Sequence, residues 1–158
     1  MYVLNFTFQQ SLLLQLSGTF IIISLIFQFI KKHYLSVIFL LLASLCIFIF
    51  AALLDPFLNL WDERFHALVS KNLIKHPLMP TLYDEPIVDI AYDRWDRYHI
   101  WLHKQPLFLW QIALSFKLFG ISEFTLRLPS IVLVTIFSFI TYRCGYLLIN
   151  QRVGYIAV

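Results

Sequence analysis

Three long apolar runs limit what this chain can fold into more than any other feature. They cover residues 12–30, 35–54 and 128–149, and Arg143 is the only charged residue within them. A helix of about 20 mostly apolar residues crosses the roughly 30 Å hydrocarbon core of a bilayer. The sequence therefore predicts an all-α integral membrane protein with several transmembrane helices.

The composition agrees with a membrane protein and argues against other classes. Of the 158 residues, 60% are hydrophobic and 13% are charged, whereas about a quarter of the residues of a soluble domain are charged. The net charge of +3 is spread along the chain, so no nucleic-acid partner is expected. Cys46 and Cys144 lie inside predicted spans, where we interpret them as small apolar packing residues.

The two ends of the chain add expectations about its organisation. No basic residue precedes the first run, and Lys31 and Lys32 follow it where a signal peptide would have its cleavage site. We therefore expect a retained span. Residues 153–158 begin another apolar segment, which we interpret as the start of a fourth span. Residues 1–158 would then be the N-terminal part of a longer membrane domain.

The basic residues predict the orientation of the spans. Short loops rich in Lys and Arg stay cytoplasmic, which puts the link at 31–33 inside. Residues 55–127 then form a large loop on the outer face, and Arg143 and Arg152 bracket the cytoplasmic end of the third span. This arrangement fits a multi-pass membrane protein with its chemistry on the outer face.

The outer loop is expected to carry interfacial helices. Asp55 and Pro56 look like a helix start, and apolar residues at helical spacing continue to about Lys75. Residues 107–119 are apolar but short for a span. We favour an interfacial helix there, with a membrane crossing as the alternative. All four tryptophans fall in the loop, as expected at a membrane–water boundary: Trp61, Trp95, Trp101 and Trp110.

Acidic residues concentrate in the same loop, eight of the nine between Asp55 and Asp96. Asp62 and Glu63 are adjacent, so on a helix their side chains diverge by about 100°. We expect one to face a cavity and the other to face a second partner. Asp62 and His66 share a helix face and could act together as a general base. The alternative is a solvated first turn whose charges suit the helix dipole.

Lys104 is the cation that could complete this site. A lysine near the headgroup layer can contact a lipid phosphate as a compact charge, and the alternative is an ordinary snorkelling lysine. The phosphate role requires Asp62 and Glu63 to lie nearby in space. His99 and His103 have a spacing that metals can use, but we interpret both as structural. No cofactor is predicted, and a divalent metal stays open.

Three motifs together resemble a known family. They are Leu-Trp-Asp-Glu-Arg-Phe-His-Ala at 60–67, His-Lys-Gln-Pro-Leu-Phe-Leu-Trp at 103–110 and Leu-Phe-Gly-Ile-Ser-Glu-Phe-Thr-Leu-Arg-Leu-Pro-Ser at 118–130. The combination resembles the N-terminal part of GT-C membrane glycosyltransferases that use polyprenyl-phosphate sugars. Among these it is similar to the bacterial aminoarabinose transferase of lipid A and to protein O-mannosyltransferase-like enzymes.

The resemblance implies roles for particular residues. Asp62 would be the catalytic base or a group that orients the substrate, with Glu63 beside it. We also expect His66 to support Asp62. Lys104 would contact the donor phosphate, with His103 and Arg64 also on the phosphate side. The implied partners are a polyprenyl-phosphate-linked sugar, a lipid, glycan or protein acceptor, and membrane lipids. The implied location is the bacterial cytoplasmic (inner) membrane, with the active site on the periplasmic face.

The chain departs from the family pattern at two places. Phe65 and His66 stand where the family commonly has Arg and Tyr, and Gln105 replaces the first proline of Lys-Pro-Pro. Two other functions stay open: a transporter or flippase, or a non-catalytic membrane subunit handling lipid-linked sugars. Transporters place ionisable residues near the bilayer midplane, and the predicted spans have none there, which favours an enzyme.

Overall fold

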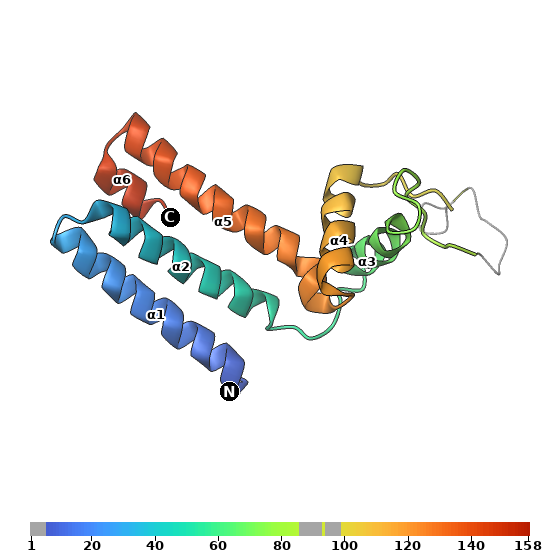
Figure 1. Cartoon of the computed structure of the whole chain (residues 1–158), viewed down its shortest axis with the longest axis horizontal. Coiled ribbons are helices and arrows are strands. Elements are labelled where there is room, and N and C mark those ends of the chain that lie inside the picture. Colours follow the sequence, from blue (N-terminus) through green and yellow to red (C-terminus); the bar gives the residue numbers. More distant parts are fainter. Residues whose placement is uncertain (1–5, 86–92, 94–98) are drawn as a thin grey trace. The chain divides into compact units, whose positions relative to one another are not determined.

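The described residues of the computed structural model, 6–85, 93 and 99–158, form an all-α protein (Figure 1). Trp95 and most of the loop around it lie outside the described residues. The chain divides into two compact units, unit 1 with residues 1–55 and 130–158, and unit 2 with residues 56–129. In chain order the helices are α1 (Phe8–Phe29), α2 (His33–Ala52), α3 (Asp62–Leu73), α4 (Pro106–Phe119), α5 (Glu123–Leu148) and α6 (Gln151–Ile156).

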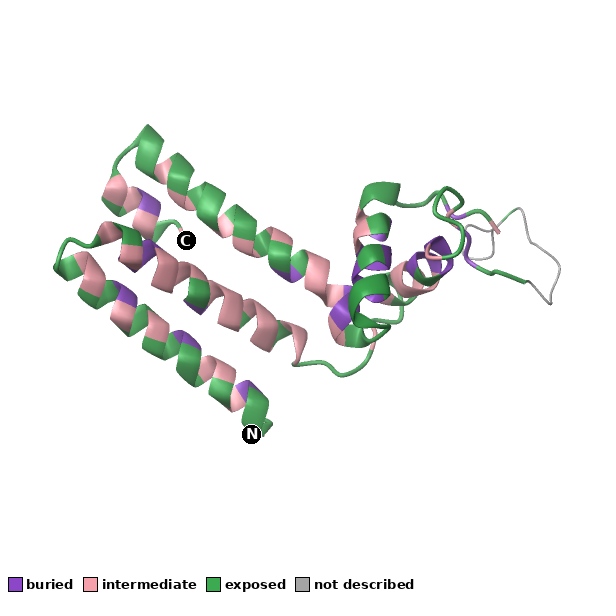
Figure 2. Ribbon diagram, in the orientation of Figure 1, coloured by how far each residue is buried: buried purple, intermediate pink, exposed green. Residues whose placement is uncertain are grey.

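The three predicted spans are confirmed as helices long and apolar enough to cross a membrane. They are α1, α2 and α5, and most of their residues are exposed or half-buried (Figure 2). Helices α1 and α5 begin earlier than the predicted residues 12 and 128, and local hydrogen bonds explain both starts. Thr7 and Gln10 form a reciprocal capping box before α1, and Ser122 and Thr125 exchange hydrogen bonds at the start of α5.

Small polar side chains join α1 to α2 within unit 1. Ser17 Oγ donates to Ala43 O at 3.1 Å, and Ser24 and Ser36 each donate to the other's carbonyl oxygen, at 2.6 and 2.9 Å. All three serines are buried. Small residues let helix backbones approach closely in a membrane, and their hydroxyls bond across the interface. These serines therefore define the contact between the first two spans.

Helix α6 folds back against the end of α5. A Cβ added to Gly145 would lie 2.7 Å from Gly154 Cα, so the backbones touch at this glycine pair. The Tyr155 hydroxyl also lies 2.7 Å from Ser24 Oγ, which links α6 to α1. The assignment of 153–158 as the start of a fourth span stays a prediction.

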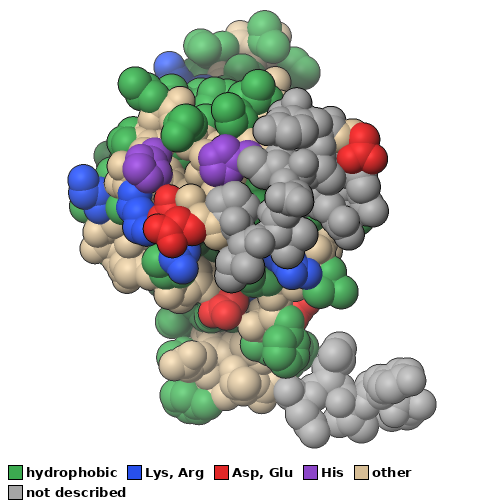
Figure 3. All heavy atoms as spheres, turned by 90° about the vertical axis from the view of Figure 1, so that its right-hand side faces the viewer, with side chains coloured by type: hydrophobic (Ala, Val, Ile, Leu, Met, Phe, Trp, Pro, Cys, Tyr) green, Lys and Arg blue, Asp and Glu red, His purple; other side chains and the backbone are tan. Residues whose placement is uncertain are grey.

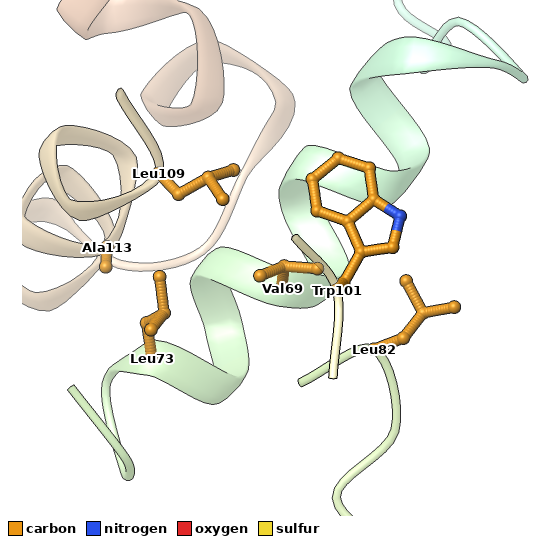
Figure 4. Packing of buried hydrophobic residues seen from close by; sticks show 6 residues of the cluster. All are labelled: Val69, Leu73, Leu82, Trp101, Leu109 and Ala113. Atoms are coloured by element: carbon orange, nitrogen blue, oxygen red, sulfur yellow. The ribbon is translucent and has the colours of Figure 1, made fainter. Parts of the chain in front are cut away.

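Unit 2 has its own apolar core, in which α3 packs on α4. Figure 4 shows the cluster, to which the two helices and the segments around Leu82 and Trp101 contribute. Its buried members are Val69, Leu73, Leu82, Trp101, Leu109 and Ala113. Ser70 Oγ donates to Leu109 O at 3.1 Å inside the contact. The core explains why α4 is ordered against α3; its placement on the outer face of a membrane stays a prediction.

The predicted helix start at Asp55 is wrong. Residues 53–61 are turns and irregular backbone, and α3 begins at Asp62. Asn59 decides this boundary, because its Oδ1 accepts from the backbone N–H of Trp61 at 2.9 Å and of Asp62 at 3.4 Å. Such local side-chain bonds satisfy first-turn donors that have no intrahelical partner. Phe57 precedes the helix and is 76% exposed.

Pro129 lies inside α5, where a proline removes one helical hydrogen bond. The carbonyl left without that donor belongs to Thr125, four residues earlier. Ser115 Oγ of α4 donates to Thr125 O at 2.7 Å, and both residues are buried. A side chain from the neighbouring helix thus satisfies the carbonyl that the proline frees.

Candidate functional site

The candidate site centres on a charge pair between two distant parts of unit 2. Lys104 Nζ lies 3.7 Å from Asp62 Oδ1. This distance allows ion pairing but is too long for a hydrogen bond. Both side chains remain accessible, 42% exposed for Lys104 and 60% for Asp62. The expected proximity of these two residues is therefore present, and a charged ligand could reach both.

Local structure fixes both members of the pair. Asp62 is the first residue of α3, where a carboxylate is favoured by the helix dipole. Lys104 immediately precedes Gln105, the N-cap of α4, and Pro106 begins that helix. Helices α3 and α4 pack on each other in the core of unit 2. This packing holds Asp62, at the start of α3, close to Lys104, just before α4. Figure 3 shows acidic, basic and histidine side chains gathered on a face of the molecule.

Glu63 points to a different partner, as its position on a helix predicts. Arg127 Nε donates to Glu63 Oε1 at 2.8 Å, and Nη2 donates to Oε2 at 2.9 Å. Glu63 Oε2 also accepts from the Asn59 backbone N–H at 2.9 Å. The hydrogen bonds from Arg127 hold the pKa of Glu63 below its usual value, against the opposing effect of partial burial. Glu63 is therefore a bound carboxylate that fixes the start of α3.

Arg127 was not among the residues predicted for the site. It lies in the Leu-Arg-Leu-Pro-Ser stretch at 126–130, which contributed only to the family resemblance. The sequence did offer one indication of a role for Arg127: it is a charged residue among apolar neighbours near the start of the third predicted span. Its side chain is only 14% exposed, and a cation that is mostly buried needs a paired anion.

His66 lies one turn after Asp62 on α3, against aromatic rings. Its ring centroid is 6.0 Å from that of Trp101 and 5.5 Å from that of Phe108, both edge-on. Among the described residues its buried Nε2 has no hydrogen-bond partner. Burial lowers the pKa of His66; the charge of Asp62 opposes this shift and that of Lys104 adds to it. The imidazole is therefore neutral at pH 7.

The remaining predicted residues lie at the edge of this arrangement. The His103 ring is exposed and its centroid lies 5.7 Å from that of Trp101. Arg64 is exposed, and its backbone N–H donates to Asn59 O at 3.2 Å. Its guanidinium forms no ion pair with Asp62 in the described part of the chain. Residues 6–85, 93 and 99–158 contain no group of three His, Cys, Asp or Glu side chains placed to hold a metal ion.

Exposed apolar side chains flank the charge pair in the sequence. Leu60 is 80% exposed and Trp61 is 64% exposed just before Asp62, while Leu102 and Leu107 flank Lys104 with 78% and 64% exposed. Such side chains would suit contact with a membrane or an apolar ligand if they form one continuous patch. The charged site thus has apolar neighbours on both of its segments.

The C-terminal third of the chain resembles a known family. Residues 103–158 match the model of the dolichyl-phosphate-mannose-protein mannosyltransferase family. The match includes Lys104 and Arg127 but not Asp62, Glu63 or His66. It supports a membrane glycosyltransferase of the GT-C type, the superfamily that the motifs resemble. No curated protein and no solved structure matches the chain.

Proposed function

We propose that this chain belongs to a glycosyltransferase of the bacterial cytoplasmic membrane. The enzyme would move a sugar from a polyprenyl-phosphate donor to a lipid, glycan or protein acceptor on the outer face. The observation that carries the proposal is the accessible Asp62–Lys104 pair, in a chain whose residues 103–158 resemble mannosyltransferases that use a lipid-phosphate sugar.

The two charges suit the two ends of such a reaction. Asp62 accepts the proton of an acceptor hydroxyl, and the acceptor oxygen attacks the anomeric carbon of the donor sugar. The bond between that carbon and the phosphate oxygen breaks, and its electron pair leaves with the polyprenyl phosphate. Lys104 stabilises the negative charge that grows on this phosphate in the transition state. The attack on the face opposite the leaving group inverts the anomeric centre.

The pair also suggests how the donor prepares the base. Without substrate, the Lys104 ammonium lies 3.7 Å from the Asp62 carboxylate, so the two opposite charges attract each other. A donor phosphate competes for the same ammonium, because both anions attract it with similar Coulomb energies at short range. Donor binding then draws Lys104 away from Asp62 and leaves the carboxylate oxygens accessible to the hydroxyl of an acceptor.

Neighbouring residues have supporting roles in this proposal. Glu63, held by Arg127, fixes the first turn of α3 and hence the direction of Asp62. The neutral His66 imidazole offers a hydrogen-bond acceptor or donor to the sugar or the acceptor hydroxyl. His103 and Arg64 add positive or polar groups to the phosphate side. The exposed apolar side chains beside Asp62 and Lys104 suit a donor whose polyprenyl tail stays in the bilayer.

The test uses the full-length protein in membrane vesicles supplied with a radiolabelled polyprenyl-phosphate sugar. Asp62→Asn should abolish transfer, and Lys104→Ala should mainly raise the donor concentration needed for half-maximal rate. Matched controls come from the exposed Lys75–Asp84 ion pair of the same unit. Asp84→Asn and Lys75→Ala should keep wild-type transfer. Undiminished transfer by Asp62→Asn at normal expression would refute the assignment, as would movement of the lipid-linked sugar across the membrane without transfer.

A further inference from the structure

Unit 1 contains a cavity that the proposed reaction does not use. It lies between the first half of α2 and the second half of α5 and has a volume of about 550 Å³. This is within the roughly 300–1,000 Å³ typical of pockets for small ligands. The lining residues are His33, Tyr34, Val37, Ile38, Leu41, Phe139, Tyr142, Arg143, Tyr146 and Gln151.

The lining changes character along α2. His33 and Tyr34 occupy the first turn of the helix, and Ile38 and Leu41 lie one to two turns further. A helix rises about 1.5 Å per residue, so the polar and the apolar lining residues of α2 are about 10 Å apart along the helix axis. On α5, the polar lining residue Arg143 lies one turn after the apolar lining residue Phe139. The cavity therefore has a polar end and an apolar end, which matches an amphiphilic ligand.

The charge distribution leaves the polar end without an internal anion. Residues 1–54 and 130–158 contain no Asp or Glu, but they contain Lys31, Lys32, Arg143 and Arg152. Asp55, the single acid of unit 1, follows the other end of α2. The Arg143 guanidinium lies 5.8 Å from the Tyr146 ring centroid, a cation–π contact that involves no anion. An anion at this end has to come from outside unit 1.

The start of α2 adds a second attraction for an anion. Lys32 is its N-cap and makes no side-chain cap hydrogen bond. The first N–H groups of a helix have no intrahelical partners, and the helix dipole places partial positive charge there. His33, which lines the cavity, has its Nδ1 3.0 Å from Gln28 Oε1. Arg143 and the first turn of α2 thus approach one space from two helices.

We propose that this cavity binds an anionic glycerophospholipid. The lipid phosphate contacts Arg143 and the first turn of α2, and one acyl chain lies along Leu41 and Phe139 toward the bilayer interior. The basic residues predict that this end of the spans faces the cytoplasm, where the leaflet is rich in anionic lipids. This site is separate from the Asp62–Lys104 pair and does not depend on the proposed sugar transfer.

The test is native mass spectrometry of the full chain in detergent, with added phosphatidylglycerol or phosphatidylcholine. Wild-type protein should retain phosphatidylglycerol selectively. Arg143→Gln should weaken this retention at least about tenfold, because it removes a charge-assisted phosphate contact. Arg152→Gln removes the same charge from α6 outside the cavity lining and should keep most of the retention. Equal losses in the two variants would mean general charge attraction and would overturn the site.

Two further experiments test the site even if Arg143→Gln misfolds. Leu41→Trp fills the apolar end and leaves every cation in place, so it should also weaken phosphatidylglycerol retention. Unchanged retention in this variant would overturn the acyl-chain position. Glycerol phosphate, which has the anion without acyl chains, should fail to compete with the lipid. Effective competition would show a site for free phosphate compounds and would overturn the lipid proposal.

Discussion

Glu63 and Arg127 are joined by two parallel hydrogen bonds of 2.8 and 2.9 Å between the guanidinium and the carboxylate. Arg127 Nη2 also donates to Phe57 O at 2.9 Å. The pair thereby ties the beginning of α5 to the irregular segment before α3 and to the first turn of α3. Asp62, the neighbouring residue, is left to face Lys104. One acid of the adjacent pair therefore positions the other.

Glu63→Gln should lower the stability of unit 2 without removing a catalytic group. The amide cannot accept both guanidinium hydrogen bonds, so the substitution removes at least one of the two that join the mostly buried Arg127 side chain to residue 63. We expect the free energy of unfolding to fall by about 1–3 kcal/mol, measured as a lower thermal midpoint in detergent. Lys75→Ala, in an exposed ion pair, should leave the midpoint unchanged. An unchanged midpoint in Glu63→Gln would contradict the positioning role.

Acid pH should expose the same interaction. The folded state lowers the pKa of Glu63 from its ordinary value of 4.5, so the folded chain releases this proton more readily than the unfolded chain. The resulting stability is complete above about pH 4.5 and is lost as the pH falls through the lower folded value. Wild-type protein should lose thermal stability on acidification below pH 4.5. Glu63→Gln should show a shallower loss over the same interval, and parallel curves would contradict the prediction.

His66 should produce a pH dependence in a higher interval. Burial lowers its pKa from the ordinary 6.5, so the unfolded chain binds this proton more tightly than the folded chain. The associated stability is complete above pH 6.5 and is lost as the pH falls through the lower folded value. His66→Phe should remove this part of the dependence and should not destabilise the protein at pH 7.5, because it also removes a buried nitrogen without a partner.

The measurement is the thermal midpoint at several pH values between 5 and 7.5. If His66→Phe keeps the wild-type slope, the neutral buried imidazole is the wrong assignment.

The spans could be predicted from the sequence because run length and apolarity are local properties. The start of α3 could not, because Asn59 decides it through side-chain bonds that the apolar spacing of Phe57 and Leu60 does not reveal. That spacing continued through residues which the structure leaves exposed. Helical periodicity indicates where a helix can pack, whereas capping bonds determine where it begins.

The candidate site could be predicted in part. The proximity of Asp62 and Lys104 came from a family resemblance, and nothing in their spacing requires it. The divergence of Asp62 and Glu63 followed from helix geometry alone. The role of Arg127 could not be inferred, because its partner Glu63 lies 64 residues earlier in the chain. Contacts at such separation depend on the packing of unit 2, which local pattern does not encode.

Ser115→Ala should destabilise the protein, because Pro129 leaves the Thr125 carbonyl dependent on the Ser115 hydroxyl. The substitution leaves the buried Thr125 carbonyl without the hydroxyl that donates to it at 2.7 Å. We expect a loss of about 1–3 kcal/mol in unfolding free energy. In a Pro129→Ala background the restored helical N–H can serve the same carbonyl, so Ser115→Ala should cost less there. A double-mutant cycle on thermal or denaturant unfolding measures this difference. Equal costs in both backgrounds would show that the serine and the proline are independent.

Gly154→Ala should separate α6 from α5. A Cβ at this position would lie 2.6 Å from Tyr142 O and 2.7 Å from Tyr146 N. These are backbone atoms of α5 and cannot turn aside as a side chain could. Helix α6 therefore has to shift, and the Tyr155–Ser24 hydrogen bond of 2.7 Å should be lost with it.

Gly18→Ala in α1 is the matched control, because a Cβ there meets nothing within 4 Å. Alanine is favoured over glycine inside a helix by about 0.5–1 kcal/mol, so this variant should be as stable as wild type or more stable. The two variants add the same methyl group, and only Gly154→Ala should lower the thermal midpoint. A Tyr155→Phe substitution should reproduce part of the loss seen in Gly154→Ala and add little to it, because both act on one contact. Fully additive losses would place the effect of Gly154→Ala elsewhere in unit 1.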